Sequence, residues 1–127
     1  MRMVTVAAVQ MHCSRDVTDN LERAEQLVRQ AAAQGANVIL LPELFERQYF
    51  CQERQYDYYQ YATPLLENPA VQRFQKVAAE LQVVLPISFY ERAGNNTFNS
   101  VAVLDADGSV LGCYRTVSYT HLRAHET

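Results

Sequence analysis

The chain of 127 residues has no tryptophan, only four glycines and four prolines, and a single lysine, Lys76, beside ten arginines. So little glycine and proline, together with 49% hydrophobic residues, excludes collagen-like, low-complexity and disordered chains. No apolar run approaches the roughly 20 residues that cross a bilayer, so we expect no membrane partner. The net charge of −3 offers no basic surface for nucleic acid. The composition is typical of one globular domain, or of part of one.

Cysteine is scarce as well. Cys13, Cys51 and Cys113 are odd in number and show no C-x-x-C spacing, which argues against a disulfide framework and against a structural zinc site. The first residues lack the charged and long apolar regions of a secretory signal. We therefore expect a reduced, cytoplasmic setting and a chain that holds no metal or cofactor.

The first 41 residues predict a β-α-β unit. Residues 3–11, rich in valine and alanine, fit a buried strand, and apolar residues recur at helical spacing between Asp16, a plausible N-cap, and Gly35. The short apolar run at 36–41 fits a strand buried on both faces. Two strands joined by a helix in this way are expected to be parallel.

The remaining pattern predicts a second helix and three more strands. The helix begins at Asn68 and Pro69, with Lys76 off its apolar stripe. Turn signals separate the strands, which we expect over residues 83–90, 97–104 and 110–115. The prediction is an α/β sheet that starts parallel and continues with hairpins, with both helices on one face.

The last eleven residues, 117–127, break this pattern. They follow a strand directly and offer neither strand alternation nor a capped helix. Their sequence resembles translated adapter read-through, so we expect a non-native tail after a native segment at 1–116. His121 and His125, which are spaced four residues apart as metal ligands on a helix can be, then drop out of any functional argument.

The most informative single residue is Glu43, which follows Leu41-Pro42. A carboxylate just beyond the carboxyl end of a buried parallel strand lies where open α/β sheets place their sites. Such a group can act as a general base. Its position alone favours a solvated loop glutamate, although both interpretations stay open at this point.

Four motifs occur in order along the chain. They are Val-x-Val-Ala-x-x-Gln at 4–10, Gly-Ala with an apolar run and Pro-Glu-Leu at 35–44, Asn-x-x-x with an apolar run and Asp-x-x-Gly at 99–108, and a strand that ends in Tyr-Arg at 114–115. In this arrangement the chain resembles the N-terminal half of the carbon–nitrogen hydrolase (nitrilase) superfamily. Within that superfamily the N-carbamoylputrescine amidases are the most similar, through residues 43–52, 68–75 and 85–100.

The resemblance implies an α/β fold that is the N-terminal part of an α-β-β-α sandwich. It also implies a Glu-Lys-Cys triad, in which the cysteine attacks the carbon of a C–N bond, the glutamate is the general base and the lysine stabilises the developing oxyanion. Glu43 matches the glutamate. The lysine would follow Arg115, where this chain has Thr116, and the cysteine would lie tens of residues further on. The present chain is therefore expected to be inactive.

The resemblance also implies a small-molecule N-carbamoyl amine as substrate. The expected reaction converts N-carbamoylputrescine to putrescine, CO2 and ammonia in polyamine biosynthesis, without a cofactor and in a homo-oligomer when the protein is full length. In relatives the loop after the glutamate borders the substrate pocket. Glu46, Tyr49 and Phe50 are the candidates here to bind a cationic amine, although each also fits ordinary loop packing.

Two other functions stay open. Thr116 favours a non-catalytic binding or regulatory α/β domain that keeps the fold without the triad. A ureidopropionase-like amidase of the same superfamily would need a cationic pocket, and the acidic and aromatic residues at 43–61 argue against one.

Overall fold

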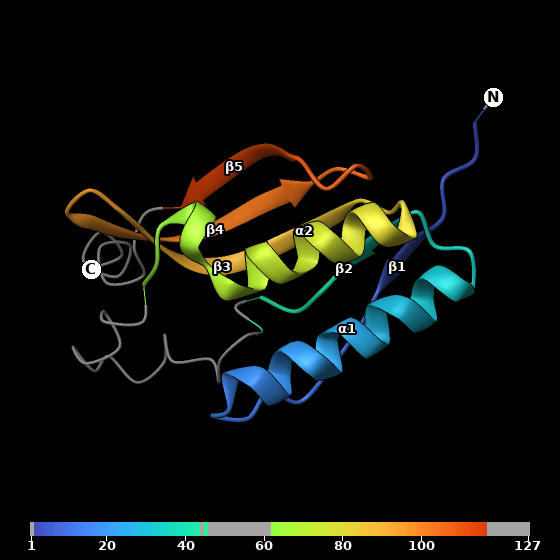
Figure 1. Cartoon of the computed structure of the whole chain (residues 1–127), viewed down its shortest axis with the longest axis horizontal. Helices are drawn as coiled ribbons and strands as arrows, with labels where there is room; N and C mark the ends of the chain where they lie inside the picture. The colour runs from blue at the N-terminus through green and yellow to red at the C-terminus, as the bar shows by residue number, and fades with distance from the viewer. Residues whose placement is uncertain (1, 44, 46–61, 117–127) are drawn as a thin grey trace, which may run out of the picture.

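The computed structural model describes residues 2–43, 45 and 62–116, and Figure 1 shows the arrangement of their helices and strands. In chain order the elements are β1 (Val6–Ala8), α1 (Val17–Ala33), β2 (Val38–Leu40), the short 3₁₀ helix η2 (Leu65–Glu67), α2 (Pro69–Leu81), β3 (Leu85–Ala93), β4 (Asn96–Leu104) and β5 (Val110–Thr116). This mixture of helices and strands confirms the predicted α/β class. In the described part of the chain, no helix is both long and apolar enough to cross a bilayer.

Both helices begin at the predicted caps. The Asp16 carboxylate accepts a hydrogen bond from the Asp19 amide at 3.2 Å, and the Asn68 side chain accepts one from the Val71 amide at 3.0 Å. Each bond satisfies an amide that the first helical turn leaves without an intrahelical partner. The helix α1 ends before Gly35, whose φ of 98° is a conformation that glycine adopts readily.

The strands follow one another across the molecule in chain order. β1 and β2 are parallel, and β3, β4 and β5 form an antiparallel meander. A parallel bridge between Val38 and Val84 joins the two groups, with the Ile39 amide 3.1 Å from the Val84 carbonyl oxygen. The predicted start with parallel strands and continuation by hairpins is therefore confirmed.

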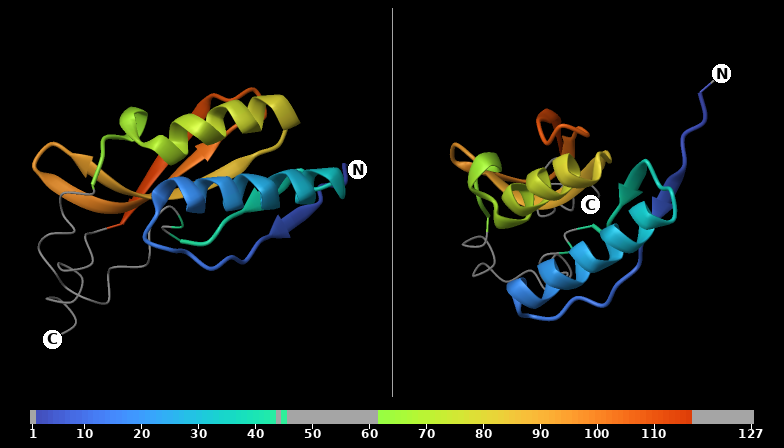
Figure 2. Two further views of the ribbon diagram at one scale, coloured as in Figure 1. Left: turned by 60° about the horizontal axis from the view of Figure 1, so that its bottom comes forward. Right: turned by 45° about the vertical axis from the view of Figure 1, so that its right-hand side comes forward.

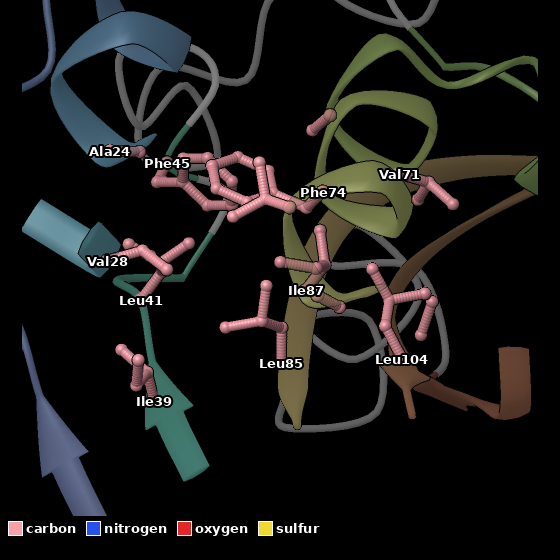
Figure 3. Close-up of a cluster of buried hydrophobic side chains, with 14 of the residues drawn as sticks. Ala24, Val28, Ile39, Leu41, Phe45, Val71, Phe74, Leu85, Ile87 and Leu104 are labelled. Atoms are coloured by element: carbon pink, nitrogen blue, oxygen red, sulfur yellow. The ribbon is translucent and has the colours of Figure 1, made fainter. Parts of the chain in front are cut away.

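Figures 1 and 2 show both helices on the same side of these strands. Among the described residues, a hydrophobic core lies between the helices and this face of the strands. Side chains of matching parity point into it from β2, β3 and β4, which confirms that both helices cover the same face. Phe45 and Phe74 meet edge to face in this core, with ring centroids 5.7 Å apart (Figure 3). Fully buried core residues include Ala24, Val28, Ile39, Phe45, Val71, Phe74, Leu85, Ile87 and Leu104.

The prediction that β1 is buried and that β2 is buried on both faces is wrong in this structure. Val6 is 68% exposed and Leu40 is 49% exposed, while Ile39, the residue before Leu40, is fully buried on the other face. The helices cover only one face, and within the described residues no element packs on the other. The apolar run at 36–41 therefore predicted the strand β2 correctly, but it did not show how many faces of that strand are covered.

The turn between β4 and β5 contacts α2, and this contact leaves no room for a side chain at Gly108. The Gln75 side-chain amide donates to the Gly108 carbonyl oxygen at 3.1 Å. Gly108 has a φ of 89°, and a Cβ atom at this position would lie 2.7 Å from the Gln75 carbonyl oxygen. The close approach of turn and helix fixes where β5 starts.

We expect Gly108→Ala to lower the free energy of unfolding by about 1–3 kcal/mol, since alanine is strained at positive φ and would also push the turn off α2. Gly94→Ala is the matched control, because Gly94 also has positive φ (63°) but open space around its Cα. Urea denaturation of the two variants separates the cost of positive φ, which both share, from the cost of the contact with Gln75, which only Gly108→Ala meets. Equal losses would show that the contact with Gln75 contributes nothing.

Candidate active site

Glu43 stands on a stretch of backbone that is anchored on both sides. Leu41 before it and Phe45 after it are both buried in the core, at 4% and 0% exposure. The Cys13 thiol also donates to the Phe45 carbonyl oxygen at 3.1 Å, which ties the segment after β1 to the segment after β2. Glu43 itself is exposed. The fold therefore presents a carboxylate to solvent from a turn that lies between two core residues, Leu41 and Phe45.

The Glu43 carboxylate has a specific partner in Asn99 on β4. The Asn99 side-chain amide donates to Glu43 Oε1 across 56 residues of sequence. Ser88 on β3 donates in turn to Asn99 Oδ1 at 3.4 Å, so three polar side chains from β3, β4 and the β2 turn form a short chain. A glutamate with a defined partner differs from the freely solvated loop glutamate that position alone allowed.

A β-bulge determines which residue of β5 lies beside Asn99. Leu104 pairs with Val110, but Val103 pairs with Gly112, so Leu111 is an extra residue in β5. Beyond the bulge Asn99 pairs with position 116, and directly opposed residues of antiparallel strands face the same side of a sheet. The position that follows Arg115 is therefore on the sheet face that carries Asn99 and receives Glu43.

The same bulge puts Arg115 on the opposite, helix-covered face, where it binds Glu91. Arg115 Nε and Nη2 lie 2.6 and 2.9 Å from the two carboxylate oxygens of Glu91, and the Ser100 hydroxyl donates to Glu91 at 2.8 Å. The Glu91 side chain is only 2% exposed. The hydrogen bonds from Arg115 are the main cause that lowers the pKa of the Glu91 carboxyl, against the effect of burial.

The two cysteines that the structure describes are not arranged as nucleophiles. Burial raises the pKa of the Cys13 thiol and is also the main cause that raises the pKa of the Cys113 thiol. A raised pKa reduces the thiolate, which is the reactive form. Within residues 2–43, 45 and 62–116, no group of three or more His, Cys, Asp or Glu side chains is placed to hold a metal ion.

Several predicted site residues cannot be placed. Glu46, Tyr49 and Phe50, the candidates for substrate binding, lie outside the described residues, as does Cys51. Glu43 is described, and sequence reasoning did not assign it a partner. Asn99 already stood out as the first residue of the third motif, but only the pairing of β4 with its neighbours reveals that it reaches Glu43.

The sequence matches one protein family over almost its whole length. The family model described as "Carbon-nitrogen hydrolase" matches residues 5–127. The chain belongs to the carbon–nitrogen hydrolase family. Among solved structures, a carbon–nitrogen hydrolase from Helicobacter pylori G27 superposes with a TM-score of 0.81 at 27% identity, over 91% of this chain and 40% of that one. The predicted fold, the N-terminal part of the family's architecture, agrees with this likeness.

Curated members of the family are also similar in sequence. The N-carbamoylputrescine amidase of Oryza sativa subsp. japonica is 53% identical over 112 residues, which are 88% of this chain and 37% of the relative. The citrullinase of Francisella tularensis is 41% identical over 115 residues, which are 91% of this chain and 40% of the relative. The chain thus spans less than half the length of these carbon–nitrogen hydrolases.

Proposed function

We propose that residues 1–116 are the N-terminal part of an amidohydrolase that cleaves a linear C–N bond, and that residues 117–127 are a non-native tail. The observation that carries the proposal is the arrangement around Glu43: a carboxylate held by Asn99 on the sheet face that also contains position 116. Membership of the carbon–nitrogen hydrolase family supports the same reaction class.

In the proposed reaction Glu43 takes the proton from a cysteine thiol supplied by sequence beyond this chain. The thiolate attacks the carbonyl carbon of the substrate, and a lysine at the position after Arg115 stabilises the oxyanion. The protonated Glu43 gives this proton to the leaving nitrogen as a thioester-type intermediate forms. Glu43, again a carboxylate, then takes a proton from the water that hydrolyses the intermediate, and the proton passes to the departing cysteine thiolate. The three side chains suffice for this chemistry, so the proposal invokes no cofactor.

We propose N-carbamoylputrescine as the substrate, with putrescine, CO2 and ammonia as products and a role in polyamine biosynthesis. The higher identity to the rice amidase than to the citrullinase supports this choice. Both relatives are named for compounds that end in a ureido group, which makes that group the common element of recognition. Glu46, Tyr49 and Phe50 are proposed to receive the cationic end of the amine.

The test begins with the source gene, sequenced past the codon for residue 116. We expect a lysine directly after Arg115 and a cysteine tens of residues further on, and we expect the full-length protein to release ammonia from N-carbamoylputrescine. Citrulline and ureidopropionate at equal concentration are the comparison substrates. An intact reading frame without that lysine and cysteine would sink the catalytic proposal. The family match extends through residue 127. The newly determined gene sequence will therefore also decide whether residues 117–127 are native.

The residue at position 116 favours one alternative, a binding or regulatory domain without catalysis. Thr116 stands where the family's lysine is expected, so the present sequence lacks one triad member. Calorimetric binding and ammonia release, measured on the same full-length protein, separate the two functions. Binding of N-carbamoylputrescine without ammonia release would favour the alternative.

The remaining expectations belong to the same proposal. We propose a cytoplasmic enzyme that assembles as a homo-oligomer when full length. Fractionation of the native host and light scattering of the purified full-length protein test these two points. A ureidopropionase-like specificity remains the second choice of substrate, and ammonia release from ureidopropionate above that from N-carbamoylputrescine would establish it.

A further inference from the structure

We propose that Asn99 is a positioning residue for Glu43, an inference that rests on the proposed function of Glu43 as general base. Asn99 is proposed to act on the reaction through its contact with Glu43, so its effect is indirect. Its side-chain amide donates to Glu43 Oε1, and its own oxygen accepts from Ser88. Asn99 therefore transmits the rigid geometry of the β3–β4 hairpin to a carboxylate on a separate turn.

The position of Asn99 in the sheet explains why this residue is suited to the task. Asn99 pairs with Tyr90 on one side and with position 116 on the other, so it occupies the middle strand at the end of the meander. β3 and β4 pair over all nine residues from Leu85–Ala93, which makes the hairpin the most extensively paired part of the described sheet. A hydrogen bond from this strand fixes Glu43 relative to the end of β5.

The amide is also chemically matched to a general base. An asparagine Nδ2 can only donate, so it binds the unprotonated carboxylate and leaves the second oxygen, Oε2, for a proton. It carries no charge, and so it orients the carboxylate without competing as an ion-pair partner. Asparagine thus holds the base in place and keeps it reactive.

The pairing of Asn99 with position 116 extends the argument. Position 116 is paired directly with Asn99, and directly opposed residues of antiparallel strands belong to the same face of a sheet. Without the extra residue Leu111, the register that starts at the Leu104–Val110 pair would place Arg115, and not position 116, opposite Asn99. Position 116 would then belong to the face that the helices cover. The bulge and Asn99 together place position 116 and Glu43 on one face.

The experiment compares variants of the full-length protein. Asn99→Ala is expected to lower kcat for N-carbamoylputrescine about 10²-fold with KM within about 3-fold of wild type, because a displaced base slows the chemistry more than it weakens binding. Asn99→Asp keeps the shape and adds a second carboxylate, so the acid limb of the kcat/KM profile should move to higher pH. A purely structural role would lower the amount of folded protein without moving this limb.

Thr97→Ala is the matched control. Thr97 lies two residues from Asn99 on the same face of β4, and it shares a hydrogen bond of 3.1 Å with Tyr90 instead of one with Glu43. We expect wild-type kcat and an unmoved pH profile for this variant. Equal losses in kcat for Thr97→Ala and Asn99→Ala would overturn the proposal, because a local hairpin defect would then explain both.

A crystal structure of the full-length Asn99→Ala protein provides a reading that does not depend on activity. We expect the Glu43 carboxylate to leave the sheet face or to lose a single orientation. A carboxylate unmoved in that variant, or an unchanged kcat, overturns the role of Asn99. If Glu43→Gln retains wild-type kcat, the proposed base itself is wrong, and that result is separate from the structural outcome for Asn99.

Discussion

Glu43→Gln is expected to lower the kcat of the full-length protein about 10²–10⁴-fold, the usual contribution of a general base. Glutamine has nearly the same size, and its side-chain oxygen can still accept the hydrogen bond that Asn99 donates to Glu43. The variant thus keeps the local geometry and loses only the ability to take a proton. Ammonia release from N-carbamoylputrescine under saturating conditions measures the effect, and KM should change little.

Glu67→Gln is the control for this substitution. Glu67 is also an exposed glutamate, at the end of η2, and the proposed reaction gives it no role. Its replacement removes the same charge without touching the site, so kcat should match wild type. Wild-type kcat in Glu43→Gln would mean that another group is the base, and the arrangement around Asn99 would then need a different explanation.

The local part of the fold was readable from the sequence because its determinants are local. Asp16 and Asn68 cap the helices through bonds to amides three residues away. The turns near Gly94 and Gly108 join strands that follow one another directly in the chain. These turn signals, with the alternation of apolar and polar residues between them, predicted β3, β4 and β5 closely. The apolar residues of β1 and β2 indicated strands as well. Val6 and Leu40 could not reveal which faces are covered, because that depends on elements far away in sequence.

The contacts of the candidate site were out of reach for the opposite reason. Asn99 and Glu43 are separated by 56 residues, and no periodicity connects a turn to a distant hairpin. The residue beside Asn99 depends on one inserted residue, Leu111, in β5. A shift of one residue moves every following side chain to the other face of a sheet. Glu91 did carry a signal, since a charged residue that shares the parity of core-facing Phe89 and Ile87 requires a buried partner.

The second large effect concerns that partner. Arg115→Met is expected to lower the free energy of unfolding by about 1–3 kcal/mol at pH 7, because the Glu91 side chain is only 2% exposed and loses its charged partner. The figure stays below that of a fully buried pair, since the Arg115 side chain is 46% exposed and water screens the pair. Urea denaturation measures the loss. Arg29→Met is the control: Arg29 is as exposed as Arg115, but its partners Glu25 and Glu80 are 22% and 58% exposed, and we expect a loss of at most about 1 kcal/mol.

The pH dependence of that loss distinguishes a buried charge from lost packing. In the wild type the pKa of Glu91 is lowered on folding, chiefly by Arg115, so the pair's contribution is complete above the unfolded pKa of about 4.3 and disappears as pH falls through the folded pKa. Without Arg115 the main cause that lowers the folded pKa is gone, so the variant loses less stability than the wild type as the pH falls. The difference between the two proteins should therefore shrink on acidification. The double variant Glu91→Gln/Arg115→Met should recover much of the stability lost at pH 7. If the loss does not depend on pH and the double variant retains it, the cause is the lost packing of the arginine stem instead.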